Sequence, residues 1–409
     1  MFDKKFYIGN RQALLESASA SMVVLGASGL VQQSADMTFP FRQDSNFWYL
    51  TGLDIADAVI VFNKNSQSVY VVLPEREKHR DLWEGALDID GMKMTSGVDV
   101  FLSHKEGWAR IKEEASAAES VGSIVPETTY MGVYGMHIHP SKLLFRSRLR
   151  RAVTKEKLVD IRKDMARLRQ VKQAPEITAI RKAVAITDQS LLALKAAIKG
   201  MKTEQEVDIF LSERFRSLGG HGHGYDPIVA SGLNAATIHH QKNDGILAKN
   251  ELLLMDVGAK YHGYSADVSR TWSIGTPTKV QKDIYNAVLE TQTFAIGLLK
   301  PSVIIRDFQK EVVAYQINAL INAGIYKESE RAEREKDYPH LISHHLGLDV
   351  HDAGMYDEPL VAGAVVTVEP GVYLPEMRIG ARIEDDILIT ATGAENLSAH
   401  PPDNLLYLV

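Results

Sequence analysis

Short apolar runs separated by polar turns mark the first part of the chain. Residues 21–25, 58–62, 68–73 and 98–102 each have the length and apolar character of a strand, with Gly- and Asn-containing turns between them. The aromatic segment 41–52 lies between polar turn residues, and we interpret it as a packed loop that enters a strand. The mixed pattern predicts a smaller mixed α/β N-terminal domain over residues 1–165.

A basic stretch over residues 146–172 follows. Its positive charges could contact phosphates, but Leu158, Ile161, Met165 and Leu168 recur at helical spacing. We therefore expect a solvated amphipathic helix that connects two domains.

Longer periodic segments dominate the second part of the chain. Pro175 begins a predicted helix that runs to residue 199, and Thr203 with Glu206 forms a capping box for the next helix. Two further helices are expected at 281–300 and 306–323. Strand hairpins at 252–272 and 364–390 follow the two helix pairs, which hints at duplicated halves. The fold class is therefore α+β, with helices packed on a curved antiparallel sheet over residues 166–409.

The composition is that of an ordinary globular protein, with 45% hydrophobic and 24% charged residues. A net charge of −6 argues against nucleic acid as the main partner. No apolar stretch reaches the roughly 18 residues that a membrane span needs, so we expect no membrane partner. The absence of cysteine fits a reducing compartment and removes thiolate chemistry, which makes a cytoplasmic location the expectation.

Two aspartates mark the first hairpin of the second domain. An apolar run ends in Asp256, and Asp267 lies in the returning run. A symmetric hairpin with its two-residue loop at residues 261–262 places the two aspartates opposite one another, roughly 4.5–5.5 Å apart. Such a pair is either an ordinary surface feature or a ligand set for a divalent cation, because close buried carboxylates repel one another.

Two glutamates mark the second hairpin. Glu369 follows the apolar run 364–368, and Glu384 lies in the neighbouring run 378–387. Histidines in the segment 338–352 offer an imidazole. Four carboxylates with one nitrogen favour manganese or a similar ion, and four negative charges roughly balance two divalent metal ions. Hydrolysis by activated water is the natural chemistry of such a two-metal site.

The motifs that carry these residues occur in a recognisable order. They are Asp256-x-Gly258, Gly263-Tyr264, Asp267, Arg270-Thr271, Ser343-His344 through His351-Asp352, Val368-Glu369-Pro370-Gly371 and Arg382-Ile383-Glu384-Asp385-Asp386. Together they resemble the metal-site signature of the creatinase/methionine aminopeptidase superfamily, whose catalytic domain has the pita-bread fold. Residues 42–52 are similar to the N-terminal domain of the aminopeptidase P (Xaa-Pro aminopeptidase) family, so the resemblance covers nearly the whole chain.

The resemblance implies a metal-dependent aminopeptidase that acts on peptides with N-terminal Xaa-Pro, by attack of a metal-bridging water or hydroxide. The implied manganese ligands are Asp256, Asp267, His344, Glu369 and Glu384. Asp267 and Glu384 would bridge both ions, and Glu369 would also act as general base.

Further site residues follow from the same resemblance. His239 and His351 would be catalytic, by binding the substrate and stabilising the tetrahedral intermediate. His340, Arg382, Trp83 and Tyr225 are the implied substrate-binding residues. Trp83 is similar to a tryptophan that closes the site of a neighbouring subunit, which implies a homodimer or homotetramer. The residue after His340 is Leu341, where bacterial relatives have glycine.

Two other functions fit parts of the pattern. A prolidase, which cleaves Xaa-Pro dipeptides, shares the fold and the metals but needs a cation for the free proline carboxylate and a block beyond it. The motif at residues 46–52 favours the aminopeptidase. A non-catalytic pita-bread protein would bind peptides or protein partners without metal, but such proteins lose ligands that this chain retains.

Overall fold

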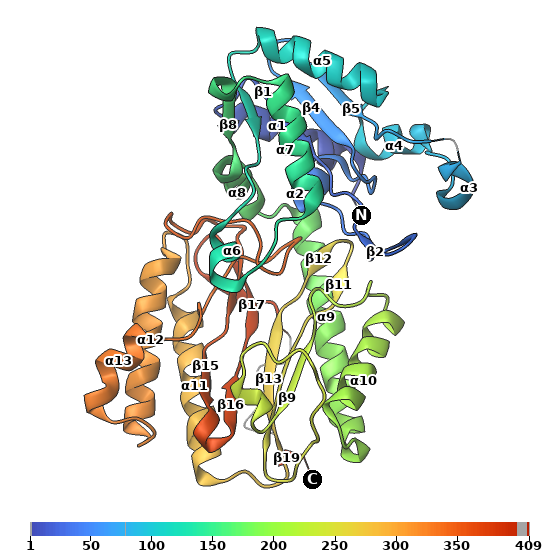
Figure 1. Cartoon of the computed structure of the whole chain (residues 1–409). Coiled ribbons are helices and arrows are strands. Elements are labelled where there is room, and N and C mark those ends of the chain that lie inside the picture. The colour runs from blue at the N-terminus through green and yellow to red at the C-terminus, as the bar shows by residue number, and fades with distance from the viewer. Residues whose placement is uncertain (1, 78, 399–406, 409) are drawn as a thin grey trace. The chain divides into compact units, whose positions relative to one another are not determined.

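The computed structural model describes residues 2–77, 79–398 and 407–408, with backbone only at 129, 130, 407 and 408. The chain divides into two compact units at residues 168 and 169 (Figure 1). The boundary that the sequence suggests, after residue 165, lies in the same helix as this division, α8 (Arg162–Gln170).

Unit 1 is built on a mixed sheet with the strand order β6-β5-β4-β1-β7-β8. The strands are β1 (Met22–Gly26), β4 (Val59–Asn63), β5 (Ser68–Val72), β6 (Val100–Leu102), β7 (Val121–Ser123) and β8 (Leu158–Asp160), with a separate pair β2 (Gln32–Ser34) and β3 (Met37–Thr38). The helices are α1 (Lys4–Ser17), α2 (Ser45–Thr51), α3 (Arg80–Glu84), α4 (Ile89–Ser96), α5 (His104–Ala117), α6 (Thr129–Tyr134) and α7 (Pro140–Ala152). Parallel and antiparallel neighbours occur in one sheet, and the four predicted strands are confirmed to within two residues at each end.

Two predictions for unit 1 and its connector were wrong. The segment 41–52 is not a loop, because Asp44 caps the helix α2 by accepting hydrogen bonds from the backbone of Asn46 and Phe47. The basic stretch is not one helix, since α7 ends at Ala152 and is followed by η1 (Lys155–Lys157), β8 and α8. Leu158 therefore lies in a strand, and its helical spacing from Ile161 is coincidental.

Unit 2 carries two pairs of long helices and several antiparallel ladders. Its helices are α9 (Ala174–Ala197), α10 (Glu204–Ser217), α11 (Lys279–Leu298), α12 (Ile305–Asn322) and α13 (Arg331–Lys336), with short η2 (Ile198–Gly200), η3 (Asn234–Ala236), η4 (Glu328–Glu330) and η5 (Pro375–Met377). Its strands are β9 (Ile228–Ser231), β10 (Leu252–Val257), β11 (Lys260–Tyr261), β12 (Tyr264–Ser265), β13 (Val268–Ile274), β14 (Val365–Val368), β15 (Gly371–Leu374), β16 (Ile379–Arg382), β17 (Asp385–Ile389), β18 (Ala394–Asn396) and β19 (Tyr407–Leu408).

Each helix pair covers its own part of the sheet (Figure 1). Apolar side chains of α9 and α10 pack on β9, β10 and β13, and those of α11 and α12 pack on β14 and β17. The predicted capping box of Thr203 and Glu206 is present at the start of α10. The helix pairs and hairpins therefore follow one another as the sequence indicates, and the α+β fold class is confirmed.

The first hairpin has a different register from the one expected. Asp256 pairs with Ser269, and the two-residue loop is His262-Gly263, where both residues have positive φ, 46° and 89°. Positive φ at both central residues is the requirement of a type I′ turn, and Gly263 meets it without strain. Asp267 thus lies just before β13 and not opposite Asp256. A shift of two residues keeps every side chain on its predicted face, so the two aspartates still converge.

The second hairpin has the expected pairing. Val368 pairs with Asp385 in β14–β17, and Gly371 pairs with Arg382 in β15–β16. Glu369 and Glu384 therefore occupy the short interruptions between these two ladders. Both ladders have the same register, so Glu369 and Glu384 fall opposite one another in the interval between them.

We expect Gly380→Ala to disturb the site-bearing strand β16. A Cβ at Gly380 would lie 1.7 Å from the carbonyl oxygen of Ala235 in η3, the turn that precedes His239. The substitution should lower the free energy of unfolding by about 1–3 kcal/mol through overpacking. Gly297→Ala in α11 is the matched control, since its Cβ would meet open space and helix propensity favours alanine. Chemical denaturation followed by circular dichroism measures both, and equal effects would contradict the expectation.

Candidate metal centre

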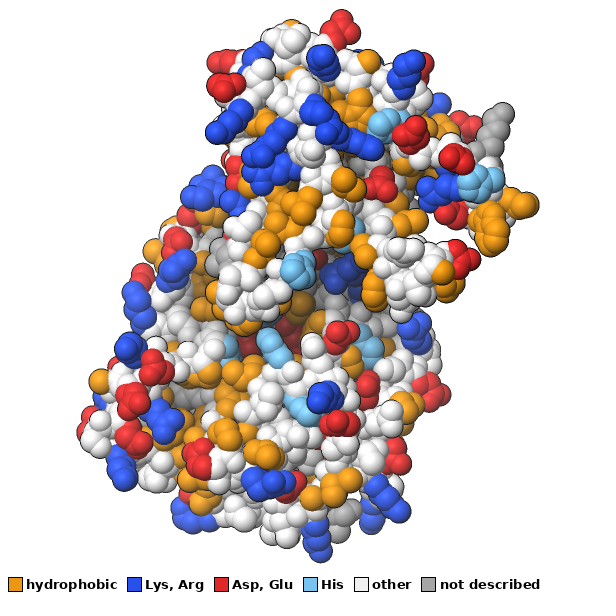
Figure 2. All heavy atoms as spheres, in the orientation of Figure 1, with side chains coloured by type: hydrophobic (Ala, Val, Ile, Leu, Met, Phe, Trp, Pro, Cys, Tyr) orange, Lys and Arg blue, Asp and Glu red, His pale blue; other side chains and the backbone are white. Residues whose placement is uncertain are grey.

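The metal-type side chains predicted from sequence converge inside unit 2. Asp267, His344 and Glu384 offer ligand atoms that all lie within 4.8 Å of one another, and all three residues are buried. The His344 Nε2 atom lies 3.4 Å from Asp267 Oδ2 and 3.4 Å from Glu369 Oε1. Figure 2 shows histidine and acidic side chains together on one face of this unit.

The fifth predicted ligand, Asp256, joins the group through a tyrosine. The Tyr225 hydroxyl lies 2.5 Å from Asp256 Oδ1 and 2.6 Å from Asp267 Oδ1. One hydroxyl contacts both carboxylates, so the aspartates are neighbours although they are not paired on the strands. Tyr225 therefore touches the proposed ligands, whereas sequence reasoning assigned it to the substrate.

Burial makes this group of carboxylates unfavourable without cations. Burial, followed by repulsion from Asp267 and Glu369, raises the pKa of Glu384 well above its usual range. Burial also raises the pKa of Glu369 to about 7. Burial opposes the charge of His344, but its hydrogen bond to Asp267 and the charge of Glu369 raise its pKa to about 9. Divalent cations would relieve the repulsion, so the oxygen-rich donor set fits such ions.

Arg382 is a buried cation at the edge of this group. Its Nη2 donates to Asp256 Oδ2 at 2.6 Å, its Nε to Ser269 Oγ at 2.8 Å and its Nη1 to the Tyr373 hydroxyl at 2.7 Å. Each nitrogen of the guanidinium has a partner, and the residue is 2% exposed. Arg382 therefore orients a metal-type carboxylate, and any effect on substrate passes through its partners.

The predicted histidines other than His344 lie around the group. The Nε2 atom of His340 lies 3.0 Å from the Tyr373 hydroxyl, and its Nδ1 lies 3.7 Å from Glu369 Oε2. The His351 ring contacts the His344 ring edge-on, with centroids 4.5 Å apart. His239 and His351 are both exposed, so a substrate can reach them.

The histidines next in sequence to His344 and His239 have different surroundings from these two. His345, next to His344, is fully buried and packs its ring on Tyr356. His240, next to His239, lies beside Glu204. Trp83 belongs to α3 in unit 1 and is 78% exposed.

Several polar side chains of the centre were not found from sequence. Ser269 Oγ donates to Glu384 Oε2 at 2.7 Å, Tyr373 links Arg382 to His340, and Asp386 Oδ2 accepts the Asp267 backbone N–H at 3.0 Å. A signal existed for the first of them. Asp267, Ser269 and Thr271 alternate along a run that is almost entirely buried, and buried polar side chains need hydrogen-bond partners.

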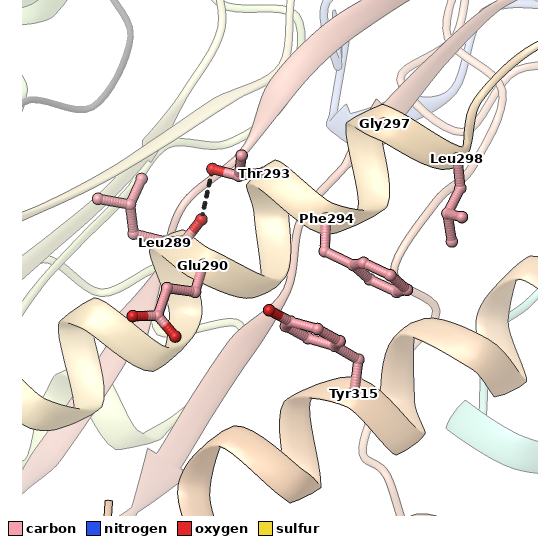
Figure 3. Close-up of a pocket in the computed structure, with 7 residues that line it drawn as sticks. All are labelled: Leu289, Glu290, Thr293, Phe294, Gly297, Leu298 and Tyr315. Atoms are coloured by element: carbon pink, nitrogen blue, oxygen red, sulfur yellow. Dashed lines mark hydrogen bonds between the residues drawn. The ribbon is translucent and has the colours of Figure 1, made fainter.

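A separate hollow of about 680 Å³ lies between α11 and α12 (Figure 3). Its wall includes Phe294 and Tyr315, whose rings stack with centroids 4.0 Å apart. No sequence-predicted site residue lines it. The candidate metal centre is therefore identified by its cluster of metal-type side chains and not by this hollow.

Comparison with known proteins places both units. Residues 178–391 match metallopeptidase family M24, and residues 7–121 match the aminopeptidase P N-terminal domain. The chain is 33% identical to the Xaa-Pro aminopeptidase of Escherichia coli over 95% of this chain and 93% of that protein. It is 29% identical to the mitochondrial intermediate cleaving peptidase 55 of Arabidopsis thaliana, over 98% of this chain and 81% of that protein. The solved structure of E. coli aminopeptidase P in its low-pH form has a TM-score of 0.82 and 30% identity, covering 98% of this chain and 96% of that one.

We expect the affinity for divalent metal to rise with pH between about 6 and 8. Glu369 and His344 have raised pKa values, so both hold protons at the lower pH that a bound metal must displace. As the pH rises through 7, Glu369 loses its proton without metal. Each proton that metal binding must displace changes the metal affinity by up to about tenfold per pH unit. Calorimetric titration with Mn²⁺ in two buffers of different ionisation enthalpy counts the released protons.

Glu369→Gln is the control for this pH dependence. The variant keeps the shape of the side chain but cannot ionise, so it should lose the Glu369 share of the dependence while His344 retains its own. An affinity of the unmodified protein that is constant from pH 6 to 8 would contradict the protonation states inferred for the centre.

Proposed function

The chain belongs to metallopeptidase family M24, and from this premise we propose how it acts as an Xaa-Pro aminopeptidase, which removes the first residue from peptides with proline second. The observation that carries the proposal is the buried group of Asp267, His344 and Glu384 in residues 166–409, which we assign as the catalytic domain. Residues 1–165 form the second domain in this proposal.

We assign two divalent ions, most simply Mn²⁺, to Asp256, Asp267, His344, Glu369 and Glu384. In this proposal Asp267 and Glu384 would be shared by both ions. When bound, such ions lower the pKa of water and polarise the scissile carbonyl. Tyr225, Ser269 and Arg382 hold the carboxylates in place through the hydrogen bonds described above.

Glu369 is the general base of the proposal. Its carboxylate, whose Oε1 lies 3.4 Å from His344 Nε2, would accept a proton from the attacking water. The same carboxyl group then delivers the proton to the leaving proline nitrogen. This step matters because the amide to proline is tertiary. Its nitrogen is a poor leaving group unless it is protonated, and it then leaves as a secondary amine.

The histidines bind the substrate in this scheme. His239 and His351 are exposed beside the buried group and would donate to the developing oxyanion. His340, held by Tyr373, would line the proline side of the site. Tyr225 and Arg382 act on the substrate through Asp256 and not by direct contact, which modifies the roles expected from sequence.

Proline explains why the peptide is gripped in this way. A peptide bond to proline has no N–H, and the ring fixes φ, so the bond cannot be held as an extended strand is held. An N-terminal amine held at the metal centre and a pocket shaped for the ring would replace that grip. In this proposal, binding of the N-terminal amine on one side of the scissile bond and of the proline ring on the other selects Xaa-Pro peptides.

The proposal extends to the oligomeric state and the cellular location of the protein. The exposed Trp83 supports a homodimer or homotetramer in which this indole reaches the site of another copy. We propose a cytoplasmic location, although one relative is named as mitochondrial. None of the helices described here is apolar and long enough to cross a membrane.

Hydrolysis of two substrates side by side tests the activity. With Mn²⁺, an Xaa-Pro-Xaa tripeptide should release its first residue, and the corresponding Xaa-Pro dipeptide should react little. Asp267→Ala should be inactive on both, because it removes a shared ligand. Preference for the dipeptide would identify a prolidase. Metal binding without cleavage of either peptide would favour the non-catalytic alternative.

His351→Ala tests the role of an exposed histidine. Loss of an oxyanion donor should lower kcat by about 10²–10³-fold. The metal content should not change, since His351 is not a proposed ligand. His221→Ala is the matched control, because His221 is also exposed and its ring packs on Tyr261 and His262. Steady-state kinetics with metal analysis decide the point, and a change in KM alone would contradict a role in the transition state.

A further inference from the structure

A second group of metal-type side chains lies outside the centre described above. Glu204, His240 and Asp244 offer ligand atoms that all lie within 4.8 Å of one another. Glu204 is the first residue of α10, which packs on β9 (Figure 1). His240 and Asp244 belong to the segment that follows His239.

The buried Glu204 carboxylate accepts hydrogen bonds from three separate segments of the chain. It accepts hydrogen bonds from the Ser231 backbone at 2.6 Å, the Gly245 backbone at 2.7 Å and the Asn234 side-chain amide at 3.0 Å. The two oxygens have about four lone-pair sites. Oε2 accepts one short hydrogen bond, from Gly245, and a longer one from Asn234 at 3.2 Å, so Oε2 is the more open site of the carboxylate. All three donors are neutral. Among the described residues, no lysine or arginine nitrogen lies within 4.0 Å of this carboxylate, and the nearest ionisable nitrogen belongs to His240.

The His240 ring points its Nε2 atom at this open site. That atom is buried and has no hydrogen-bond partner in the described part of the chain. A buried polar atom without a partner costs about 1–3 kcal/mol, so its position requires an explanation. It lies 3.5 Å from Glu204 Oε2 and 3.5 Å from Asp244 Oδ1.

These separations distinguish a shared cation from a direct ion pair. If His240 were protonated and bonded to the carboxylates, the charged hydrogen bonds would be about 2.7–2.9 Å long. Ligands at zinc–nitrogen and zinc–oxygen distances of about 2.0–2.2 Å in a tetrahedron lie roughly 3.4 Å apart. Both nitrogen–oxygen separations match this arrangement, and all three ligand atoms lie within 4.8 Å of one another.

We propose that Glu204, His240 and Asp244 bind a divalent cation of the zinc type, with water in the fourth position. One imidazole and two carboxylates form a donor set suited to zinc. The bound ion joins α10 and the end of β9 to the segment that carries His239. It therefore has a structural role next to the catalytic centre and is separate from the two catalytic ions.

Metal counting on the intact protein tests this proposal. The probe is Zn²⁺ at a fixed micromolar free concentration, reached by equilibrium dialysis and followed by elemental analysis. His240→Gln and Asp244→Asn should each bind one ion fewer per chain than the unmodified protein. Asp244 has an exposed side chain, so its substitution leaves the fold intact even where His240→Gln disturbs it.

Matched substitutions control for adventitious binding. His221→Gln and Asp337→Asn change an exposed histidine and an aspartate outside the group, and their zinc content should equal that of the unmodified protein. Zinc should also raise the melting temperature of the unmodified protein by more than that of Asp244→Asn. Equal zinc content in Asp244→Asn and the unmodified protein would overturn the proposal, as would loss of an ion in His221→Gln. In that case the His240 ring contacts the two carboxylates without a shared metal ion.

Discussion

The mutual repulsion of buried carboxylates is the constraint on which the centre depends. Asp256, Asp267, Glu369 and Glu384 lie together in the interior of unit 2, where an uncompensated negative charge is strongly unfavourable. The chain supplies a buried cation, Arg382, and the hydroxyls of Tyr225 and Ser269, but these do not balance four charges. In the proposed function, divalent ions would complete the balance, which would link metal binding to the local stability of this unit.

The registers of the two hairpins bring the carboxylates together. Glu369 and Glu384 face one another where the ladders β14–β17 and β15–β16 are interrupted, and Asp267 lies between β12 and β13. Within a regular strand, successive side chains point to opposite faces. Asp267 lies two residues before Ser269, the partner of Asp256, and Glu369 lies in register with Glu384, so each pair shares a face. The helix pairs on the apolar faces keep the ladders in place.

The polar partners of the ligands explain why this arrangement is rigid before any ion binds. Arg382 contacts Asp256, Ser269 and Tyr373 at once, and Tyr373 in turn holds His340. Orientation of ligands by such hydrogen bonds reduces the reorganisation that metal and substrate require. A guanidinium can do this at one position because its donors form a planar fork, which a lysine ammonium lacks.

Sequence alone determined the α+β class, the long helices and the capping box at Thr203, because these follow from local periodicity and spacing. It also pointed to four carboxylates that the structure brings close together. It misplaced the turn of the first hairpin by one residue, since the preference of Gly263 for positive φ outweighs symmetry about the aspartates. It also assigned Tyr225 and Arg382 to the substrate, because residue type cannot tell a pocket wall from a ligand's partner. Only the tertiary structure decided those contacts, in which Arg382 meets Ser269 from a strand more than a hundred residues away in sequence. Such contacts depend on register and packing, which no local pattern encodes.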